Sequence, residues 1–327
     1  MRSGLQRPAK GAATLAVDEK KAAFRAYMRA GDPSGLAALE TKALSAGVSE
    51  EGGYLAPDET ERLIAAALKQ VSPIRSIATV REIGGNVFKK PVSQGETASG
   101  WVGETAARPQ TATPSLQSLD FPTMELYAMP AATASLLDDS AVEIDPWIAE
   151  EVRVAFAEQE GQAFVSGNGS NKPRGFLDYP KVANGSWSWG NIGTVATGVA
   201  GAFPATAPAD TLIDLVYSVK AGYRANAHFV VNRATQSVIR KMKDGEGNYL
   251  WQPSNAPGAA ATILGFPVVE AEDMPDIATD AHAVAFGDFN RGYLVVDRVG
   301  IRVLRDPYSA KPYVLFYTTK RVGGGIQ

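Results

Sequence analysis

The longest helical pattern in the chain lies near its middle. Asp145 is a favourable helix-capping residue, Pro146 suits a first helical position, and Glu150 and Glu151 suit the first turns. Apolar residues then recur at spacings of three, four and seven, which predicts a helix from Pro146 to Ser166, about 30 Å long at ~1.5 Å per residue. We expect one buried stripe on it, made of Ile148, Val152, Ala155, Phe156, Ala163 and Phe164.

The first 72 residues have weaker patterns. Residues 17–30 form an amphipathic helical pattern with Phe24, Tyr27 and Met28 on one side, and shorter helical stretches follow at 34–44 and near 58–70. A glycine-rich, extended connector separates them. These pieces cannot build a core of their own, so we expect an N-terminal arm over residues 1–72 that lies on something else.

Residues 82–122 have no helical periodicity and are dense in Gly, Thr, Ser, Pro and Ala. The pattern predicts a long two-stranded hairpin. Such a hairpin is marginally stable alone, and ordering it costs about 1–2 kcal/mol of backbone entropy per residue. Its few large side chains cannot offset that cost. We therefore expect it to be ordered only against a neighbouring subunit, which points to assembly.

The remaining segments alternate strands and helices. Residues 123–139 predict a strand and then a short helix, and 180–205 are rich in turns, where we expect Trp187 and Trp189 to pack on a core rather than stack on bases or sugars. Helices at 210–225 and 233–244, with strands at 228–232 and Phe266–Glu270, predict a small α/β unit over about 208–288. Strands within 283–304 and at 313–319 should close back onto the long helix.

The stretch GNGSNKPRGF, residues 167–176, has the composition of a phosphate-binding loop. Such loops precede a helix, whereas this one follows a helix, where free carbonyls repel anions. The known templates also fail, because Lys172 replaces the third glycine and Pro173 follows it. We expect instead that Gly167 or Asn168 forms a left-handed helix cap, that Pro173 stops the helix, and that a strand begins at Phe176.

Composition removes most catalytic chemistry. The 327 residues include no cysteine and two histidines, and the net charge is −3. Disulfides, thiolate zinc sites and cysteine nucleophiles are excluded, and no catalytic, cofactor-binding or metal site is predicted. The acidic stretch Glu270, Glu272, Asp273 and Asp276 lacks the spacing of a calcium loop, so we expect a solvated turn. No apolar run reaches the roughly 18 residues of a membrane span, and no signal-peptide pattern is present.

Several short motifs occur in a characteristic order. They are GGYLAPDE, GWVGE, FVSGNGSNKPRGFL, FVVNRATQSVIRKMKDGEGNYLWQPS, LGFPVVEAEDMP, AFGDF and KRVGG. By their order and spacing the chain, from about residue 40 onward, resembles the tailed-phage major capsid proteins with the Hong Kong 97-type fold. The resemblance implies an α+β fold with five parts: an N-terminal arm (1–72), a long β-hairpin E-loop with its base (73–122), a peripheral domain with the spine helix (123–204), an α/β axial domain (205–288) and the return strands of the peripheral domain (289–327).

The resemblance implies a non-enzymatic function without cofactors. The protein would self-assemble in a bacterial cytoplasm, as pentamers and hexamers, into the icosahedral head of a phage or a gene transfer agent. The head would enclose double-stranded DNA without sequence specificity. Portal, scaffold or protease, and head-completion proteins would be further partners. Candidate contacts between subunits are Trp101, Glu104, Arg108, Lys172 and Arg174. An encapsulin-like protein compartment and a phosphate-loop nucleotide-binding enzyme remain as alternatives.

The chain departs from the family pattern in two ways. The type member cross-links a hairpin lysine to an asparagine in a neighbouring subunit's loop, but here the hairpin lysines, Lys89 and Lys90, lie near its base and the candidate receiving loop RDPYSAKPYV has no asparagine. We therefore expect no covalent cross-links. Family precursors often carry a scaffolding segment of about a hundred residues, whereas about 40 residues precede SAGVSEEGGYLAP here. We expect a chain that is already trimmed or that uses a separate scaffold.

Overall fold

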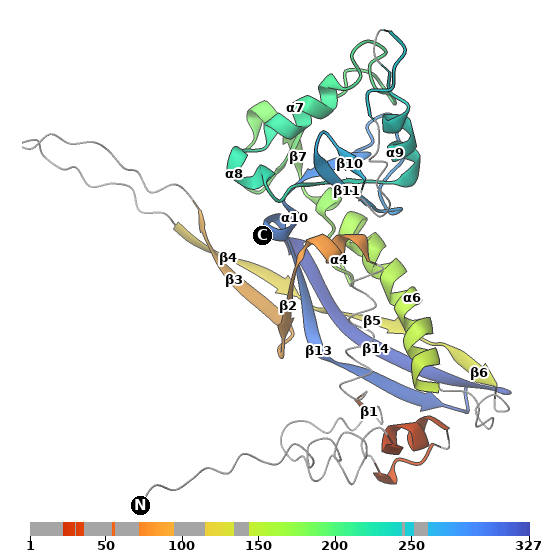
Figure 1. Ribbon diagram of the computed structural model, residues 1–327. Coiled ribbons are helices and arrows are strands. Elements are labelled where there is room, and N and C mark those ends of the chain that lie inside the picture. Colours follow the sequence, from red (N-terminus) through yellow and green to blue (C-terminus); the bar gives the residue numbers. More distant parts are fainter. Residues whose placement is uncertain are drawn as a thin grey trace, which may run out of the picture. The chain divides into compact units, whose positions relative to one another are not determined.

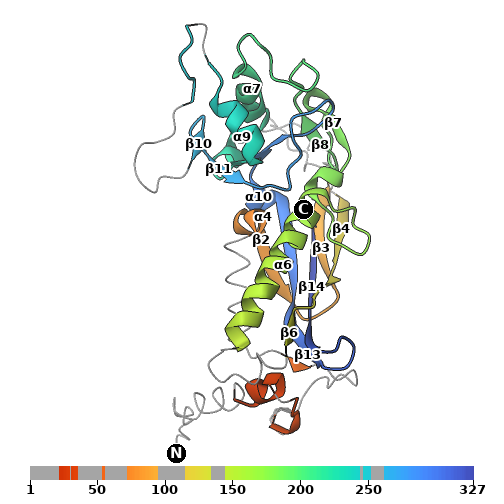
Figure 2. The ribbon, with the colours of Figure 1, turned by 90° about the vertical axis from the view of Figure 1, so that its right-hand side faces the viewer.

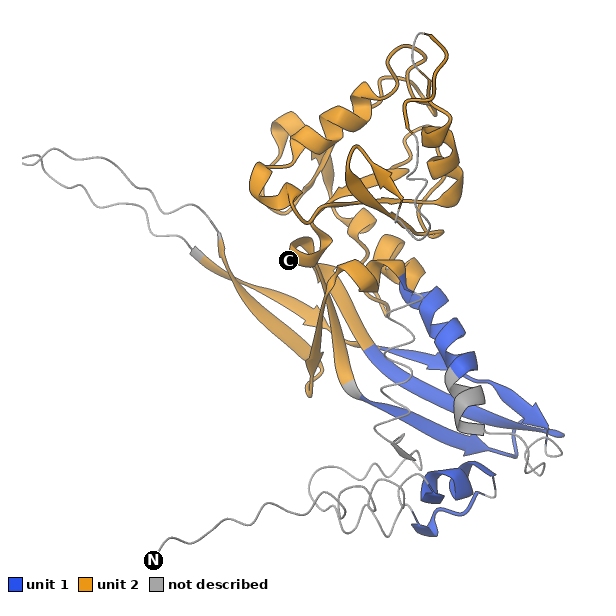
Figure 3. Ribbon diagram, viewed as in Figure 1, with its two compact units in different colours: residues 1–72, 125–160, 299–321 blue, residues 73–124, 161–298, 322–327 orange. Residues whose placement is uncertain are grey.

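The structure is a computed structural model that describes residues 22–29, 31–35, 54–55, 72–94, 115–133, 144–243, 246–251 and 261–327. The chain divides into two compact units (Figure 3). Unit 1 comprises residues 1–72, 125–160 and 299–321, and unit 2 comprises residues 73–124, 161–298 and 322–327. The predicted helix near 58–70 and most of the predicted helix at 34–44 lie outside the described residues.

Unit 1 is built on long antiparallel strands. Strand β13 (Tyr293–Asp306) contributes its second half, which pairs with β1 (Tyr54–Leu55), and β14 (Tyr313–Ile326) contributes its first half, which pairs with β6 (Ala131–Thr133). Strand β5 (Met124–Ala128) lies beside β14. The predicted strand at 123–139 is therefore confirmed, but a second strand, β6, follows it. Residues 134–143 lie outside the described part.

The helical pattern of the arm is confirmed for residues 22–29, which are helical. Phe24, Tyr27 and Met28 are buried in the core of unit 1 together with Phe156 and Phe316. Full burial of each large apolar side chain contributes about 1.5–3 kcal/mol, so the expected docking of the arm has a clear source of free energy.

The end of this arm helix is closed by Arg305 and a glycine. Arg305 donates from Nε to the carbonyl of Met28 and from its guanidinium to that of Arg29, both at 3.1 Å. Gly31 has a φ of 77° and donates its N–H to the carbonyl of Tyr27 at 2.8 Å. A cation and a left-handed glycine satisfy the carbonyls that a helix end leaves free.

The long helix predicted from the sequence is α6 (Ile144–Ser166). It ends at Ser166 as predicted but starts two residues before Pro146, so Asp145 lies within the helix and does not cap it. Val152, Phe156, Ala163 and Phe164 are buried, which confirms these members of the stripe, and Ala155 is half-buried. The side chain of Ile148 lies outside the described part.

Unit 2 contains a four-stranded sheet in the order β10-β11-β9-β12. The strands are β9 (His228–Val231), β10 (Thr262–Ile263), β11 (Phe266–Glu270) and β12 (Val284–Gly287), and β9 runs parallel to β11. Helices α7 (Asp210–Ser218), α8 (Ala221–Arg224) and α9 (Arg233–Arg240) accompany the sheet (Figure 1). Leu212, Val216, Phe229 and Ile239 are among the residues of its buried core.

The predicted α/β unit is therefore confirmed, with two corrections. The helix predicted at 210–225 is two helices, because Val219 has extended backbone angles (φ −89°, ψ 130°). The helix predicted at 233–244 ends at Arg240. Its N-cap is Asn232, whose side chain accepts the N–H of Thr235 at 2.7 Å.

The hairpin consists of β3 (Val87–Gln94) and β4 (Ser115–Pro122), which pair antiparallel from Val87↔Pro122 to Gln94↔Ser115. Figures 1 and 2 show the two strands side by side. The predicted hairpin is confirmed for these residues, but it begins later than residue 82. Glu82 belongs instead to β2 (Thr79–Ile83), which pairs in parallel with the first half of β13. Residues 95–114 lie outside the described part.

Strand β14 continues to Ile326, well past the predicted end at 319. Gly323, Gly324 and Gly325 lie near its end, and glycines give no alternation of apolar and polar side chains that would predict a strand. A Cβ on Gly323 would lie 2.3 Å from the carbonyl oxygen of Pro122, and one on Gly324 would lie 2.8 Å from the hydroxyl of Tyr293. Glycine is needed here because neighbouring atoms approach the strand too closely for any side chain.

Candidate assembly surfaces

The glycine loop follows α6 as predicted, and its backbone closes on itself. Asn168 and Arg174 form an antiparallel bridge, and Gly175 donates its N–H to the carbonyl of Gly167 at 2.8 Å. The chain then enters the short 3-10 helix η1 (Phe176–Asp178), so the strand predicted at Phe176 is wrong. The loop is a closed turn at a helix C-terminus, where the helix dipole disfavours a phosphate.

The predicted left-handed cap at Gly167 or Asn168 is also wrong. The left-handed residues are Gly169 (φ 73°) and Asn171 (φ 57°). Gly167 is needed for space, because a Cβ there would lie 2.1 Å from the carbonyl oxygen of Pro173 and 2.4 Å from that of Ala163. The sequence predicts a turn here, but it does not show that Gly167 has no room for a side chain.

Arg174 is the centre of the loop's contacts within its own subunit. Its Nε donates to Asp178 Oδ2 at 2.8 Å, and its guanidinium carbon lies 4.0 Å from the ring centroid of Tyr179. Its backbone carbonyl accepts the hydroxyl of Tyr293 at 2.8 Å, and its N–H donates to the carbonyl of Gly324 at 3.2 Å. Burial raises the pKa of Tyr293 well above its ordinary value, so this phenol stays a donor.

Lys172, in contrast, is exposed and has no hydrogen bond or ion pair among the described residues. Of the two loop candidates for contacts between subunits, it is the one whose charge is available to a partner. Both assignments stay predictions. Trp101, Glu104 and Arg108 lie outside the described residues, so the structure does not place them.

The hairpin lysines are engaged within the subunit. Lys90 donates from Nζ to Gln327 Oε1 at 2.6 Å, and Lys89 Nζ lies 3.8 Å from Asp120 Oδ2. Farther along the hairpin, Leu116 is 79% exposed.

The turn between β13 and β14 is held by hydrogen bonds to Asp306 and carries an exposed tyrosine. Asp306 accepts the N–H of Tyr308 at 2.9 Å, the N–H of Ser309 at 3.2 Å and the hydroxyl of Ser309. The hydrogen bond from the Ser309 side chain, with those from the backbone, holds the pKa of Asp306 below its ordinary value. Tyr308 is 80% exposed at the tip.

Trp187 and Trp189 are exposed, so the prediction that they pack on a core is wrong. They follow the 3-10 helix η2 (Asn184–Ser186), on the turn between β7 (Lys181–Ala183) and β8 (Ile192–Thr194). Trp187 Nε1 donates to the carbonyl of Asn191 at 2.8 Å, which fixes the ring on its own turn.

Each unit contains an ion pair whose side chains are largely buried. In unit 1, Lys320 Nζ lies 3.1 Å from Glu160 Oε1, with side chains 6% and 0% exposed. In unit 2, Arg75 on α4 (Pro73–Ile77) makes a two-pronged contact with Asp297 at 2.5 and 3.1 Å. Sequence reasoning missed both pairs, since their members lie far apart in the chain.

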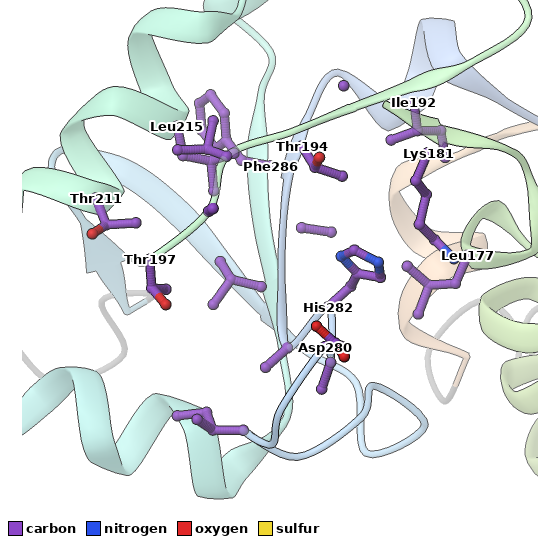
Figure 4. A pocket seen from close by; sticks show the side chains of 18 of the residues that line it. Leu177, Lys181, Ile192, Thr194, Thr197, Thr211, Leu215, Asp280, His282 and Phe286 are labelled. Carbon is purple, nitrogen blue, oxygen red and sulfur yellow. The ribbon is translucent and has the colours of Figure 1, made fainter. Parts of the chain in front are cut away.

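Unit 2 also has a cavity of about 710 Å³ (Figure 4). Apolar side chains such as Leu177, Ile192 and Phe286 line it beside Lys181 and His282. Burial lowers the pKa of His282, and the charge of Lys181 lowers it further. The charge of Asp280, which also lines the cavity, acts in the opposite direction on this pKa, and within the described part no hydrogen bond joins His282 to a carboxylate.

The acidic stretch is a turn, as expected. Arg233 Nε lies 3.6 Å from Glu272 Oε1, and Asp276 accepts from Asn232 Nδ2 at 2.7 Å. Among the described residues, no group of His, Asp or Glu side chains could hold a metal ion. None of the helices in the described ranges is long and apolar enough to cross a membrane.

Comparison with known proteins identifies the class to which this fold belongs. A family model for the phage capsid family matches residues 52–327, so the chain belongs to that family. The resemblance inferred from the order of the motifs is thereby confirmed. A search of curated proteins finds no match.

Solved structures agree with this assignment. The capsid of an empty gene transfer agent (GTA) particle, computed with C5 symmetry, is 45% identical with a TM-score of 0.73, covering 89% of this chain and 94% of that chain. The capsid of a native GTA particle is 47% identical with a TM-score of 0.72, at the same coverage. A structure from Gordonia phage Cozz shares the fold at 16% identity and a TM-score of 0.52, covering 99% of this chain and 94% of that chain. The α+β, Hong Kong 97-type fold expected from the sequence is confirmed.

Proposed function

We propose that this chain is the major capsid protein of a phage or a gene transfer agent, assembling as pentamers and hexamers into an icosahedral head that encloses double-stranded DNA. The observation that carries the proposal is the family match over residues 52–327, together with 45–47% identity to the capsids of GTA particles. Membership of a structural family also favours a non-enzymatic role.

The geometry supports a function that depends on contacts between copies. The hairpin, the β13–β14 turn and the turn with the two tryptophans each present exposed apolar or aromatic side chains, including Leu116, Tyr308 and Trp187. A hairpin of two strands gains stability from a partner. Many moderate contacts of this kind would hold a shell without covalent links.

We assign the subdomains as the resemblance implies: the arm (1–72), the E-loop and its base (73–122), the peripheral domain (123–204 and 289–327) and the axial domain (205–288). Portal, scaffold or protease, and head-completion proteins are the further partners of this proposal. Contact with packaged DNA is nonspecific and electrostatic, so it weakens as salt rises.

The two alternatives are less well supported. An encapsulin-like compartment is not favoured, because 45–47% identity links the chain to capsids of GTA particles. A phosphate-loop enzyme is not favoured, because the glycine loop lies at a helix C-terminus and Arg174 is engaged by Asp178 and Tyr179.

The test is electron microscopy of the purified protein, combined with the ultraviolet spectrum of nuclease-treated particles. We expect closed or tubular assemblies, and nuclease-protected DNA when the particles come from the producing cell. Absence of any assembly would refute the shell function. Assemblies that contain a protein cargo and no nucleic acid would support the encapsulin alternative.

A further inference from the structure

Helices α7 and α8 and the neighbouring helix α10 (Phe289–Gly292) present an exposed surface of tyrosines and cations in unit 2. Tyr217 is 70% exposed and Tyr223 is 46% exposed. The guanidinium carbon of Arg224 lies 4.9 Å from the ring centroid of Tyr217, and that of Arg291 lies 5.6 Å from the ring of Tyr223. With Lys220 between them in sequence, these residues form what we name the aromatic–arginine surface.

This surface has the composition of a binding hot spot. Tyrosine and arginine are enriched among the residues that dominate interface energies, and stacking reduces the freedom that each side chain loses on binding. Lys220 is exposed and has no ion pair within the described ranges, and Arg224 Nε is buried without a hydrogen-bond partner there. Arg291 lies 3.8 Å from Asp288, and the exposed Asp214 precedes the surface on α7. The three cations outnumber these two carboxylates, so the surface has a net positive charge.

The complementary charge lies elsewhere on the same unit. The last residue of β11 and the turn after it carry Glu270, Glu272, Asp273 and Asp276, which we name the acidic turn. Its contacts with Asn232 and Arg233 place it beside the N-terminus of α9. The contact between Arg233 and Glu272 is exposed on both sides and screened by solvent, and Glu270 and Asp276 are exposed as well. Figure 1 shows α8 and α9 on opposite sides of the four-stranded sheet.

We propose that the aromatic–arginine surface of one subunit docks on the acidic turn of a second copy. Two different surfaces meet in such a contact, so it is heterologous, and heterologous contacts close into rings when the rotation between copies is a simple fraction of a turn. Opposite charges fix the register of the contact and disfavour pairing of like surfaces. The inference rests on the proposed shell function and identifies the contact that joins subunits within a ring.

The test uses charge reversal in the full chain. One variant carries Lys220→Glu and Arg224→Glu, a second carries Glu270→Lys and Glu272→Lys, and a third combines all four substitutions. A fourth variant, Arg240→Glu with Lys241→Glu, makes the same charge change as the first variant at the C-terminal end of α9 and serves as its matched control.

We expect each single-surface variant to lower the yield of assembled particles about tenfold or more, because like charges then face each other. The control should stay within about twofold of the parent, and the four-substitution variant should recover most of the yield. Circular dichroism melts of unassembled subunits check that each variant folds. Tyr217→Ser is a further variant. Because Tyr217 is exposed, the substitution should leave the fold intact, and it should also lower the yield of assembled particles.

The outcomes separate the two proposals. If the parent protein forms no assemblies, the shell function fails and this inference with it. If the parent assembles and the single-surface variants assemble equally well, only the docking inference is overturned. Failure of the four-substitution variant to recover refutes the pairing of these two surfaces. Normal assembly with loss of packaged DNA in the Lys220 and Arg224 variant refutes it too, since the surface then contacts nucleic acid.

Discussion

The buried ion pair between Glu160 and Lys320 gives the sharpest test of what holds unit 1 together. The two side chains are 0% and 6% exposed, and Nζ lies 3.1 Å from Oε1. Removal of one partner takes away a charge 3.1 Å from a buried ion, and breaking a buried pair in this way costs about 3–5 kcal/mol. We therefore expect Lys320→Met and Glu160→Gln each to lower the free energy of unfolding by about this amount.

The chain offers a matched control on the next residue of the same strand. Arg321 lies 3.4 Å from Glu125, with the two side chains 41% and 46% exposed. A pair at this exposure is screened by solvent, and Arg321→Met should cost no more than about 1 kcal/mol. The difference in stability between Lys320→Met and Arg321→Met therefore reports the effect of burying the ion pair.

The assay is urea denaturation of unassembled subunits, followed by far-ultraviolet circular dichroism. A double variant, Glu160→Leu with Lys320→Met, removes both charges and should unfold within about 2 kcal/mol of the parent, because a buried pair can be replaced by apolar groups at little cost. If Lys320→Met costs no more than Arg321→Met, or if the double variant is as unstable as the single ones, the reasoning is wrong.

Three further predictions follow from the loops. Gly167→Ala should destabilise the subunit by about 1–3 kcal/mol, because backbone oxygens block the new Cβ; Gly185→Ala, with no atom within 4 Å, is the control in the same melts. Asp306 has a lowered pKa, so its stabilising hydrogen bonds are present at neutral pH and are lost as pH falls through that lowered value. An NMR titration should show Ser309→Ala moving the pKa of Asp306 back toward 3.8, and an unchanged pKa would contradict the assignment. Denaturing gels of mature particles should show single chains, since Lys90 contacts Gln327 within the subunit and the loop RDPYSAKPYV has no asparagine to receive a lysine; a ladder of covalent oligomers would refute this.

Strong periodicity made much of the fold predictable. The extent of α6 up to Ser166 came from helical spacing, whereas the antiparallel hairpin was inferred from the lack of helical spacing and from a composition dense in Gly, Thr, Ser and Pro. The predicted start of α6 at Pro146 was wrong by two residues, since Asp145, a good capping residue, also fits inside a helix. The break at Val219 was missed because the helical pattern of side chains continues through it.

The features that depend on distant contacts were not predictable. Trp187 and Trp189 were expected to pack on a core as a pair on one face, but both are exposed on the turn between β7 and β8. Gly167 looked like a left-handed cap, and only the positions of the Pro173 and Ala163 carbonyls show that it is needed for space. Glu160 and Lys320 carry no sequence signal that pairs them.

The late position of β14 in the chain has a consequence for how the subunit is made. Residues 313–326 leave the ribosome after every other strand in the described part, yet earlier segments depend on them. Lys90, at the base of the hairpin, donates to Gln327 across 237 positions of sequence, and the glycine loop is tied to Gly324 through Arg174. Contacts this distant form late in folding. A nascent chain therefore cannot complete these contacts at the hairpin base and the glycine loop until β14 and Gln327 have left the ribosome.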